Sequence, residues 1–121
     1  SDVRDSLLNI ISKQKKKIIV TTFASNVARM ETVFYCAKKT DRQISLVGRS
    51  MHRIYKAARQ CGYLQNLIEP VDPRDAKKIA REKIIYLSTG SQGEPMGATK
   101  RIVNGTHPDV YLEKGDTIIF S

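Results

Sequence analysis

The sequence predicts an α/β fold: a Rossmann-like, mostly parallel sheet with helices on both faces, in a single domain over residues 1–121. Short runs of β-branched residues alternate along the chain with longer amphipathic segments. Helix-length connections between successive strands favour parallel pairing, because antiparallel neighbours need only a short turn. With 121 residues, 40% of them hydrophobic, the chain is long enough to bury a core without disulfide or metal support.

The first half of the chain predicts helix and strand in alternation. Hydrophobic residues recur at helical spacing over residues 2–14, and a β-branched run over residues 17–23 predicts the first strand. The same two patterns predict a helix over residues 26–39 and a second strand over residues 43–47. Residues 50–61 then form the clearest amphipathic helix, with hydrophobic side chains on one side and basic or polar side chains on the other.

The second half of the chain is less regular. Gly62 ends the third helix, and a short helix is expected near residues 74–81, before a buried strand over residues 83–87. A loop rich in glycine and serine follows over residues 88–95. The remaining predicted elements are a helix over about residues 96–103 and two closing strands over residues 110–112 and 116–121.

Positive charge is concentrated in the first half of the chain, which has a formal net charge of +9. Residues 1–66 carry 13 basic and 4 acidic side chains, whereas residues 67–121 carry 8 of each. Residues 42–68 contain no acidic residue and five basic ones, namely Arg42, Arg49, Arg53, Lys56 and Arg59. A block of one sign is typical of surfaces that bind polyanions, although a solvated basic surface is the alternative.

Several protein classes are excluded by what the sequence lacks. Its apolar runs are only a few residues long, whereas a membrane span needs ~20, and no signal-peptide pattern opens the chain. Cys36 and Cys61 form no CxxC pair and no cluster with His52 or His107, so no zinc-ligand spacing exists. We expect two free thiols in a reducing, cytoplasmic setting, with Cys61 in the core.

Small, polar and basic residues follow three of the predicted strands. The carboxyl ends of parallel strands share one edge of a sheet, where helix N-termini offer free N–H groups to anions. Hydroxyl groups and glycines let a phosphate come close, and arginines add charge-assisted hydrogen bonds. The sequence therefore predicts an anion-binding edge, with serine capping of the helices as the alternative. The residues concerned are Thr22, Ser25, Asn26 and Arg29, then Gly48, Arg49, Ser50 and Arg53, then residues 88–94.

The loop at this edge lacks the motifs of two other functional classes. Residues 89–93 match neither a GxGxxG dinucleotide loop nor a Walker A loop. They also miss the GxSxG nucleophile elbow, and no motif places His107 or Asp109 as a base, so a hydrolase that uses Ser91 is disfavoured. An independent Rossmann-like module that binds a small phosphorylated ligand or a protein partner stays open on these grounds.

The strings at the three strand ends resemble the β-CASP domain family of ribonuclease J, and their order and spacing match as well. The resemblance covers nearly the whole chain, and four residues depart from the family pattern, namely Gly97, Thr99, Lys100 and Thr106. The strings that carry it are Thr21–Asn26 (TTFASN), Val47–Met51 (VGRSM), Ser88–Met96 (STGSQGEPM), Arg101–Gly105 (RIVNG) with His107, and Gly115–Thr117 (GDT).

The resemblance implies a domain inserted into the metallo-β-lactamase fold of a bacterial zinc-dependent ribonuclease, which cuts RNA endonucleolytically and degrades it from 5′ to 3′. In that family two zinc ions are held by motifs on either side of the β-CASP segment, so no catalytic or metal-binding residue is expected here, and the segment alone is expected to be inactive. The implied partners are single-stranded RNA and the metallo-β-lactamase domain of the same parent chain, which is expected to be a cytoplasmic homo-oligomer.

The family also implies which residues contact RNA. They are expected to bind phosphate and sugar in a channel that leads to the metals, and not to read bases. By motif match these residues are Ser25, Asn26, Arg29, Arg49, Ser50, Ser91, Gln92 and Gly93.

Overall fold

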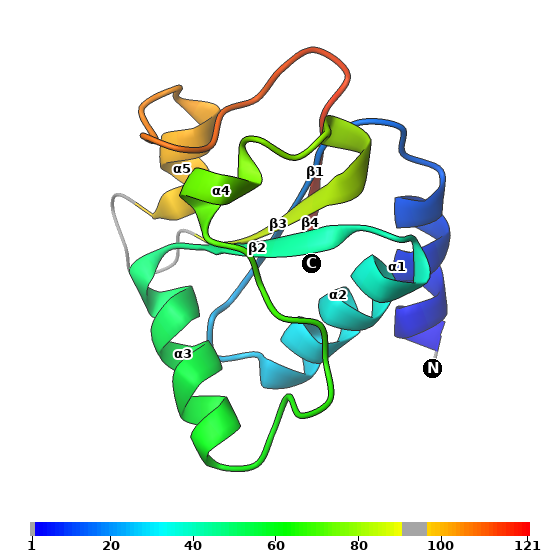
Figure 1. Cartoon of the computed structure of the whole chain (residues 1–121), viewed down its shortest axis with the longest axis vertical. Coiled ribbons are helices and arrows are strands. Elements are labelled where there is room, and N and C mark those ends of the chain that lie inside the picture. Colours follow the sequence, from blue (N-terminus) through cyan, green and yellow to red (C-terminus); the bar gives the residue numbers. More distant parts are fainter. Residues whose placement is uncertain (1, 91–96) are drawn as a thin grey trace.

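In the computed structural model, which describes residues 2–90 and 97–121, four parallel strands form one sheet in the order β2-β3-β1-β4 (Figure 1). Neighbours pair in register, with Thr22 of β1 opposite Thr89 of β3 and Val47 of β2 opposite Ser88. The predicted α/β class is therefore confirmed. The strands are β1 (Ile18–Thr22), β2 (Gln43–Val47), β3 (Ile84–Thr89) and β4 (Thr117–Phe120).

Helices cover both faces of this sheet, as predicted (Figure 1). One face carries the three longer helices, which are α1 (Asp2–Ser12), α2 (Val27–Lys39) and α3 (Arg49–Gln60). The other face carries α4 (Pro73–Ala76) and α5 (Ala98–Val103), and the short 3-10 helix η1 (Arg81–Lys83) leads into β3. Among the described residues, no helix has the length and hydrophobicity that would let it cross a membrane.

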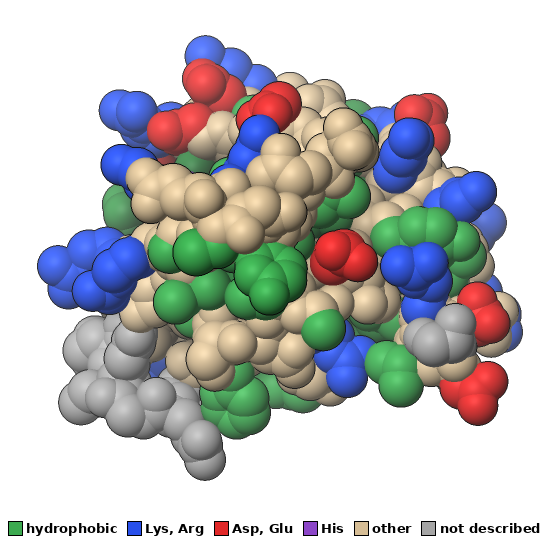
Figure 2. All heavy atoms as spheres, turned by 90° about the horizontal axis from the view of Figure 1, so that it is seen from below, with side chains coloured by type: hydrophobic (Ala, Val, Ile, Leu, Met, Phe, Trp, Pro, Cys, Tyr) green, Lys and Arg blue, Asp and Glu red, His purple; other side chains and the backbone are tan. Residues whose placement is uncertain are grey.

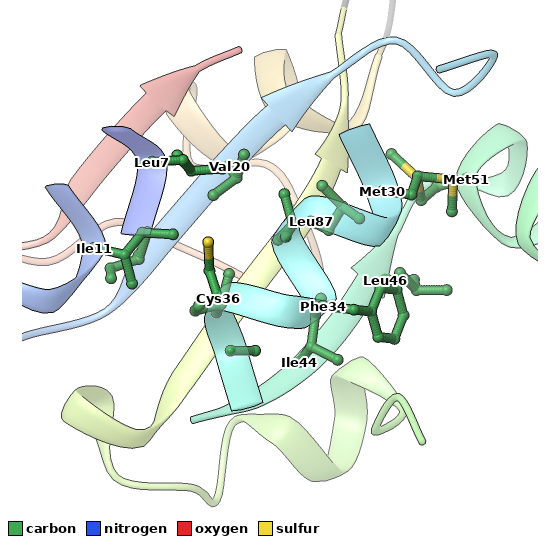
Figure 3. Packing of buried hydrophobic residues seen from close by; sticks show 14 of the residues in the cluster. Leu7, Ile11, Val20, Met30, Phe34, Cys36, Ile44, Leu46, Met51 and Leu87 are labelled. Atoms are coloured by element: carbon green, nitrogen blue, oxygen red, sulfur yellow. The ribbon is translucent and has the colours of Figure 1, made fainter. Parts of the chain in front are cut away.

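Alternation along the strands divides the core into two hydrophobic clusters. Successive strand side chains point to opposite faces, so Ile18 and Val20 pack under α1, α2 and α3, whereas Ile19 joins the cluster under α4 and α5. Figure 3 shows the larger cluster, in which Phe34 of α2 fills the space over β2. The Phe34 ring also stacks on Tyr55 of α3, with 5.7 Å between the ring centroids.

The predicted strand over residues 110–112 is wrong. This segment belongs to the loop between α5 and β4, and only residues 117–120 pair with β1. Val110 is buried in the smaller cluster, but Tyr111 and Leu112 are exposed. A buried residue next to exposed apolar ones has the composition of a strand, although residues 110–112 are not part of the sheet.

Other element boundaries moved by a few residues. β3 continues through Ser88 and Thr89, which the sequence placed in a loop, because both residues pair with the neighbouring strands. The helix expected near residues 74–81 divides into α4 and η1. Cys61 is exposed and not in the core, because it caps the C-terminus of α3 after the buried stripe has ended at Ala58.

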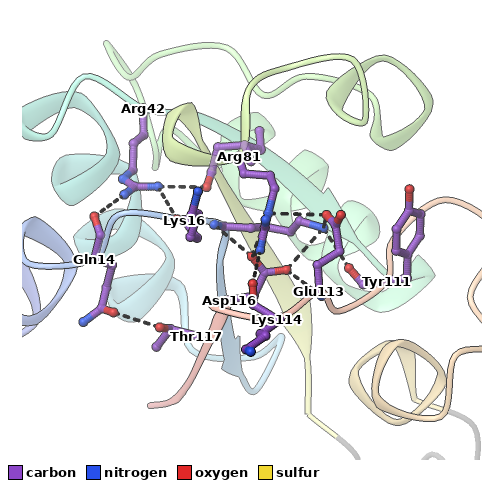
Figure 4. Close-up of polar contacts among 11 residues, drawn as sticks. Gln14, Lys16, Arg42, Arg81, Tyr111, Glu113, Lys114, Asp116 and Thr117 are labelled. Carbon is purple, nitrogen blue, oxygen red and sulfur yellow. Dashed lines mark hydrogen bonds and ion pairs between the residues drawn. The ribbon is translucent and has the colours of Figure 1, made fainter.

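A network of ion pairs fastens the amino ends of the strands (Figure 4). The Asp116 carboxylate is fully buried; it accepts hydrogen bonds from the backbone N–H of Lys17 at 3.1 Å and of Glu113 at 2.8 Å. Arg81 donates to the same carboxylate at 2.7 Å, and the Lys17 ammonium lies 3.5 Å from it. This carboxylate therefore joins the starts of β1 and β4 to η1, on the edge opposite the predicted site.

Candidate functional site

A pocket of about 320 Å³ opens at the carboxyl ends of β1 and β3, beside the start of α3. We call it the edge pocket. Its walls come from the turn after β1, the first turns of α3 and the end of β3. The lining residues are Phe23, Ala24, Ser25, Ser50, Arg53, Ile54, Thr89 and Gly90.

Gly48 shapes the turn from β2 into α3. It is the N-cap residue of this 12-residue helix and has no side chain that could cap it. Its φ of 106° is one that side-chain-bearing residues rarely adopt. A Cβ at this position would also lie 2.6 Å from Thr89 Oγ1. Glycine therefore brings the N-terminus of α3 against the end of β3.

The Thr89 hydroxyl is buried at this junction. The residue is 3% exposed, and its Oγ1 has no hydrogen-bond partner in the part of the chain that the structure describes. An unsatisfied buried hydroxyl costs about 1–3 kcal/mol. Thr89 lines the edge pocket, but its Oγ1 atom is itself buried beside Gly48.

Further hydroxyl groups hold the end of the sheet against α5. Thr99 of α5 donates to the Thr89 carbonyl at 2.7 Å. Its Oγ1 also lies 2.9 Å from Ser88 Oγ and 3.0 Å from Thr21 Oγ1. These buried contacts join α5 to the ends of β1 and β3, so the strand ends that flank the pocket have a fixed position.

The structure brings two of the predicted contact residues together and spreads others along the same edge. Ser25 and Ser50 line the edge pocket, and neither is the N-cap residue of its helix. Asn26 caps α2 instead, and its Oδ1 accepts from the backbone N–H of Arg29 at 3.0 Å. Arg29 and Arg49 lie in the first turns of α2 and α3, outside the pocket lining. The predicted residues Ser91, Gln92 and Gly93 lie outside the described residues.

Six lining residues were missing from the predicted contact set, and three of them bear on the chemistry of the site. The sequence had placed Arg53 and Thr89 on the anion-binding edge, and Arg53 lies one helical turn after Arg49. Phe23 gave no comparable signal, because its importance depends on how the ends of separate strands meet in space.

The basic block is smaller than the sequence suggests. Arg42 is 6% exposed and donates to the carbonyls of Gln14 and Lys16 at 2.8 and 3.0 Å, at the amino edge of the sheet. Burial lowers the pKa of its guanidinium, and Glu82 partly opposes that shift. Arg42 therefore supports the fold and does not belong to a polyanion surface.

Three basic residues of that block stay exposed at successive turns of α3, namely Arg49, Arg53 and Lys56. Arg59, further along, is engaged with the Tyr55 hydroxyl at 3.2 Å and with Glu69 at 3.3 Å. Figure 2 shows Lys and Arg side chains spread along the margins of one face, with acidic ones among them. A compact basic stripe on α3 is thus left beside the edge pocket.

Metal-ligating residues do not gather in the described part of the chain. No three His, Cys, Asp or Glu side chains there come close enough to hold a metal ion. His107 serves the loop after α5, where its Nδ1 accepts from the backbone N–H groups of Asp109 and Val110, each at 3.1 Å. Burial and the nearby Arg101 lower the pKa of this imidazole, and Asp109 opposes the shift.

Comparisons with known proteins agree on one family. Residues 15–121 match the family model described as the β-CASP domain of ribonuclease J. The chain is 38% identical to a protein named ribonuclease J from Synechocystis sp., over 100% of the chain and 19% of that relative. It is 39% identical to ribonuclease J 1 of Streptococcus pyogenes, over 98% of the chain and 21% of the relative. With ribonuclease J2 of Bacillus subtilis the identity is 30%, over 99% of the chain and 21% of the relative. The chain spans about a fifth of the length of these relatives.

Proposed function

Because the chain belongs to the β-CASP domain family of ribonuclease J, we propose that it is the RNA-binding part of a ribonuclease J-like nuclease. Its edge pocket and the basic stripe of α3 contact the phosphates and sugars of single-stranded RNA that passes along the carboxyl edge of the sheet. The observation that carries the proposal is the convergence of Arg53 and three hydroxyl-bearing residues on the N-terminus of α3, where the N-cap residue is a glycine.

A phosphate group suits this convergence chemically. The N-cap residue of α3 is Gly48, which has no capping side chain, and a helix N-terminus attracts negative charge. Arg53 supplies a charged donor, while Ser25 supplies a hydroxyl group that can donate to phosphate oxygens. Such contacts are indifferent to the base.

The exposed stripe of Arg49, Arg53 and Lys56 extends this site along α3. Residues at i, i+4 and i+7 lie on one side of a helix, so the three charges follow one line. Successive phosphates of a single strand can be neutralised along such a line, with release of bound counterions.

Bond cleavage falls to other parts of the parent protein in this proposal. Zinc ions held by a metallo-β-lactamase domain would supply the hydrolytic chemistry, both endonucleolytic and 5′-3′ exonucleolytic, and the chain's own residues would hold and orient the RNA. Two free cysteines suit a cytoplasmic protein. The proposal also includes a parent protein that is a homo-oligomer and depends on zinc.

Salt-dependent RNA binding tests the proposal. The chain is titrated with a fluorescently labelled oligouridylate of about eight nucleotides, at several salt concentrations. Arg53→Ala is expected to weaken binding and to reduce the slope of log Kd against log salt by about 1, because one phosphate contact is lost. Arg74→Ala is the matched control, since Arg74 is an exposed arginine of α4 that pairs with Asp72 on the other face of the sheet.

The outcomes separate this function from its rivals. Binding that ignores salt, or an Arg53→Ala variant that binds RNA as the unaltered chain does, would rule the RNA site out. Tight binding of a free nucleotide with little salt dependence would favour a module for small phosphorylated ligands. The chain with added zinc is expected to leave RNA intact, and cleavage that is lost in Ser91→Ala but resists chelators would identify a serine hydrolase.

A further inference from the structure

A second, largely apolar pocket lies next to the edge pocket. Its volume is about 540 Å³, and it is lined by residues at the ends of β1 and β4 and on α5. Three of its apolar side chains are unusually exposed: Phe23 at 49%, Val103 at 53% and Phe120 at 75%. Exposed apolar side chains gathered around one hollow indicate a binding surface, whereas scattered ones would need no explanation.

Two residues connect this apolar pocket to the edge pocket. Phe23 and Gly90 line both of them, so the two hollows meet at the turn after β1. A ligand that fills both would need an anionic part on the side of Arg53 and a flat or apolar part on the other side of the Phe23 ring.

Resting on the proposed function, we propose that the apolar pocket binds one nucleoside of the single-stranded RNA whose phosphate occupies the edge pocket. The base stacks on the Phe23 ring, with Phe120 and Val103 as further apolar contacts. Lys100, also in the lining, adds positive charge beside the backbone. Every base has a flat face, so the pocket adds affinity without demanding a sequence.

An RNA that lacks bases tests this assignment. The chain is titrated with an oligouridylate of about eight nucleotides and with an abasic RNA that carries the same number of phosphates. Phe23→Ala is expected to lower affinity for oligouridylate roughly 10-fold more than affinity for the abasic RNA. Tyr63→Ala is the matched control, because Tyr63 is an aromatic residue that is 61% exposed in the loop after α3.

A direct stacking signal comes from 2-aminopurine placed in the RNA. Its fluorescence is expected to fall on binding to the unaltered chain and to fall much less with Phe23→Leu, which keeps an apolar side chain of similar size without a ring. This variant also serves if Phe23→Ala does not fold.

The outcomes distinguish the two proposals. If the oligouridylate and the abasic RNA bind equally tightly, with salt dependence, the RNA site stands but the base pocket is overturned, and another part of a longer protein is its occupant. If Phe23→Ala weakens both RNAs equally, the ring acts on the edge pocket and not on a base, which also overturns this inference. Salt-insensitive binding, or no binding of either RNA, overturns the proposed function itself.

Discussion

Gly48 and Thr89 approach each other so closely that a side chain on Gly48 would collide with Thr89. An added Cβ would lie 2.6 Å from Thr89 Oγ1 and 3.2 Å from Ala98 Cβ, a residue of α5. The close approach places the N-terminus of α3, with Gly48 as its N-cap residue, beside the end of β3. The edge pocket therefore depends on a residue that contributes no side chain to it.

Gly48→Ala is expected to lower the free energy of unfolding by about 2 kcal/mol or more, because backbone strain and a steric clash act together. Gly105→Ala is the control, since Gly105 also has a positive φ, of 74°, but a Cβ there meets nothing within 4 Å. That variant is expected to lose only about 1 kcal/mol. Urea denaturation followed by circular dichroism measures both, and equal losses would show that the contact with Thr89 is unimportant.

The buried Asp116 carboxylate is expected to be the most costly acidic side chain to remove from the amino edge. Asp116→Ala leaves Lys17, Arg81 and two backbone N–H groups without their shared acceptor, and we expect a loss of about 3–5 kcal/mol. Glu113→Ala is the comparison, because that side chain is 41% exposed, and it is expected to cost less than about 1 kcal/mol. Similar unfolding midpoints for the two variants would contradict this view of the network.

Much of the fold was predictable because its signals are local. Residues 44–47 and 84–87 are short buried runs, and α3 has one apolar side, so periodicity alone identified these elements. Residues 110–112 misled because a single buried Val110 lies between apolar side chains that are exposed. Strand pairing is a relation between distant segments, which composition does not contain.

The site was predictable only in part for the same reason. Ser25 and Ser50 could be identified because strand ends in a parallel sheet share an edge. Arg42 was misassigned because a charge in the sequence does not reveal whether carbonyl groups surround it. The hydroxyls of Thr22 and Thr89 lack partners among the described residues, and their burial becomes visible only when β1 and β3 lie in register.

Arg42 and Arg49 are expected to separate stability from RNA binding. Arg42→Met removes the donor to three carbonyls at the amino edge, so it should lower the unfolding midpoint in urea and leave the salt slope of RNA binding unchanged. Arg49→Met, at an exposed residue of α3, should weaken binding and flatten the slope with little effect on the midpoint. If Arg42→Met instead weakened RNA binding and left the unfolding midpoint unchanged, Arg42 would belong to the polyanion-binding surface.

His107 is expected to make the stability of the chain depend on pH. Its Nδ1 accepts two backbone N–H groups, which a protonated imidazole cannot do. The pKa of His107 is lowered from 6.5 by burial and by Arg101, with Asp109 opposing, so the unfolded chain binds the proton more readily. The free energy of unfolding should therefore be independent of this group above pH 6.5, fall as the pH drops from 6.5 to the lower pKa of the folded state, and level off below it.

A variant series isolates this contribution of His107. His107→Asn keeps an acceptor for the two N–H groups but cannot titrate. As the pH falls below 6.5, the unaltered chain should therefore lose stability relative to His107→Asn. His52→Asn, which removes the other histidine from an exposed site on α3, is the control. Because the loop after α5 is attached to the helix that lines the apolar pocket, loss of its two hydrogen bonds should also weaken oligouridylate binding in acid. A difference between the unaltered chain and His107→Asn that is the same at every pH would show that the pKa of His107 is the same in the folded and the unfolded chain.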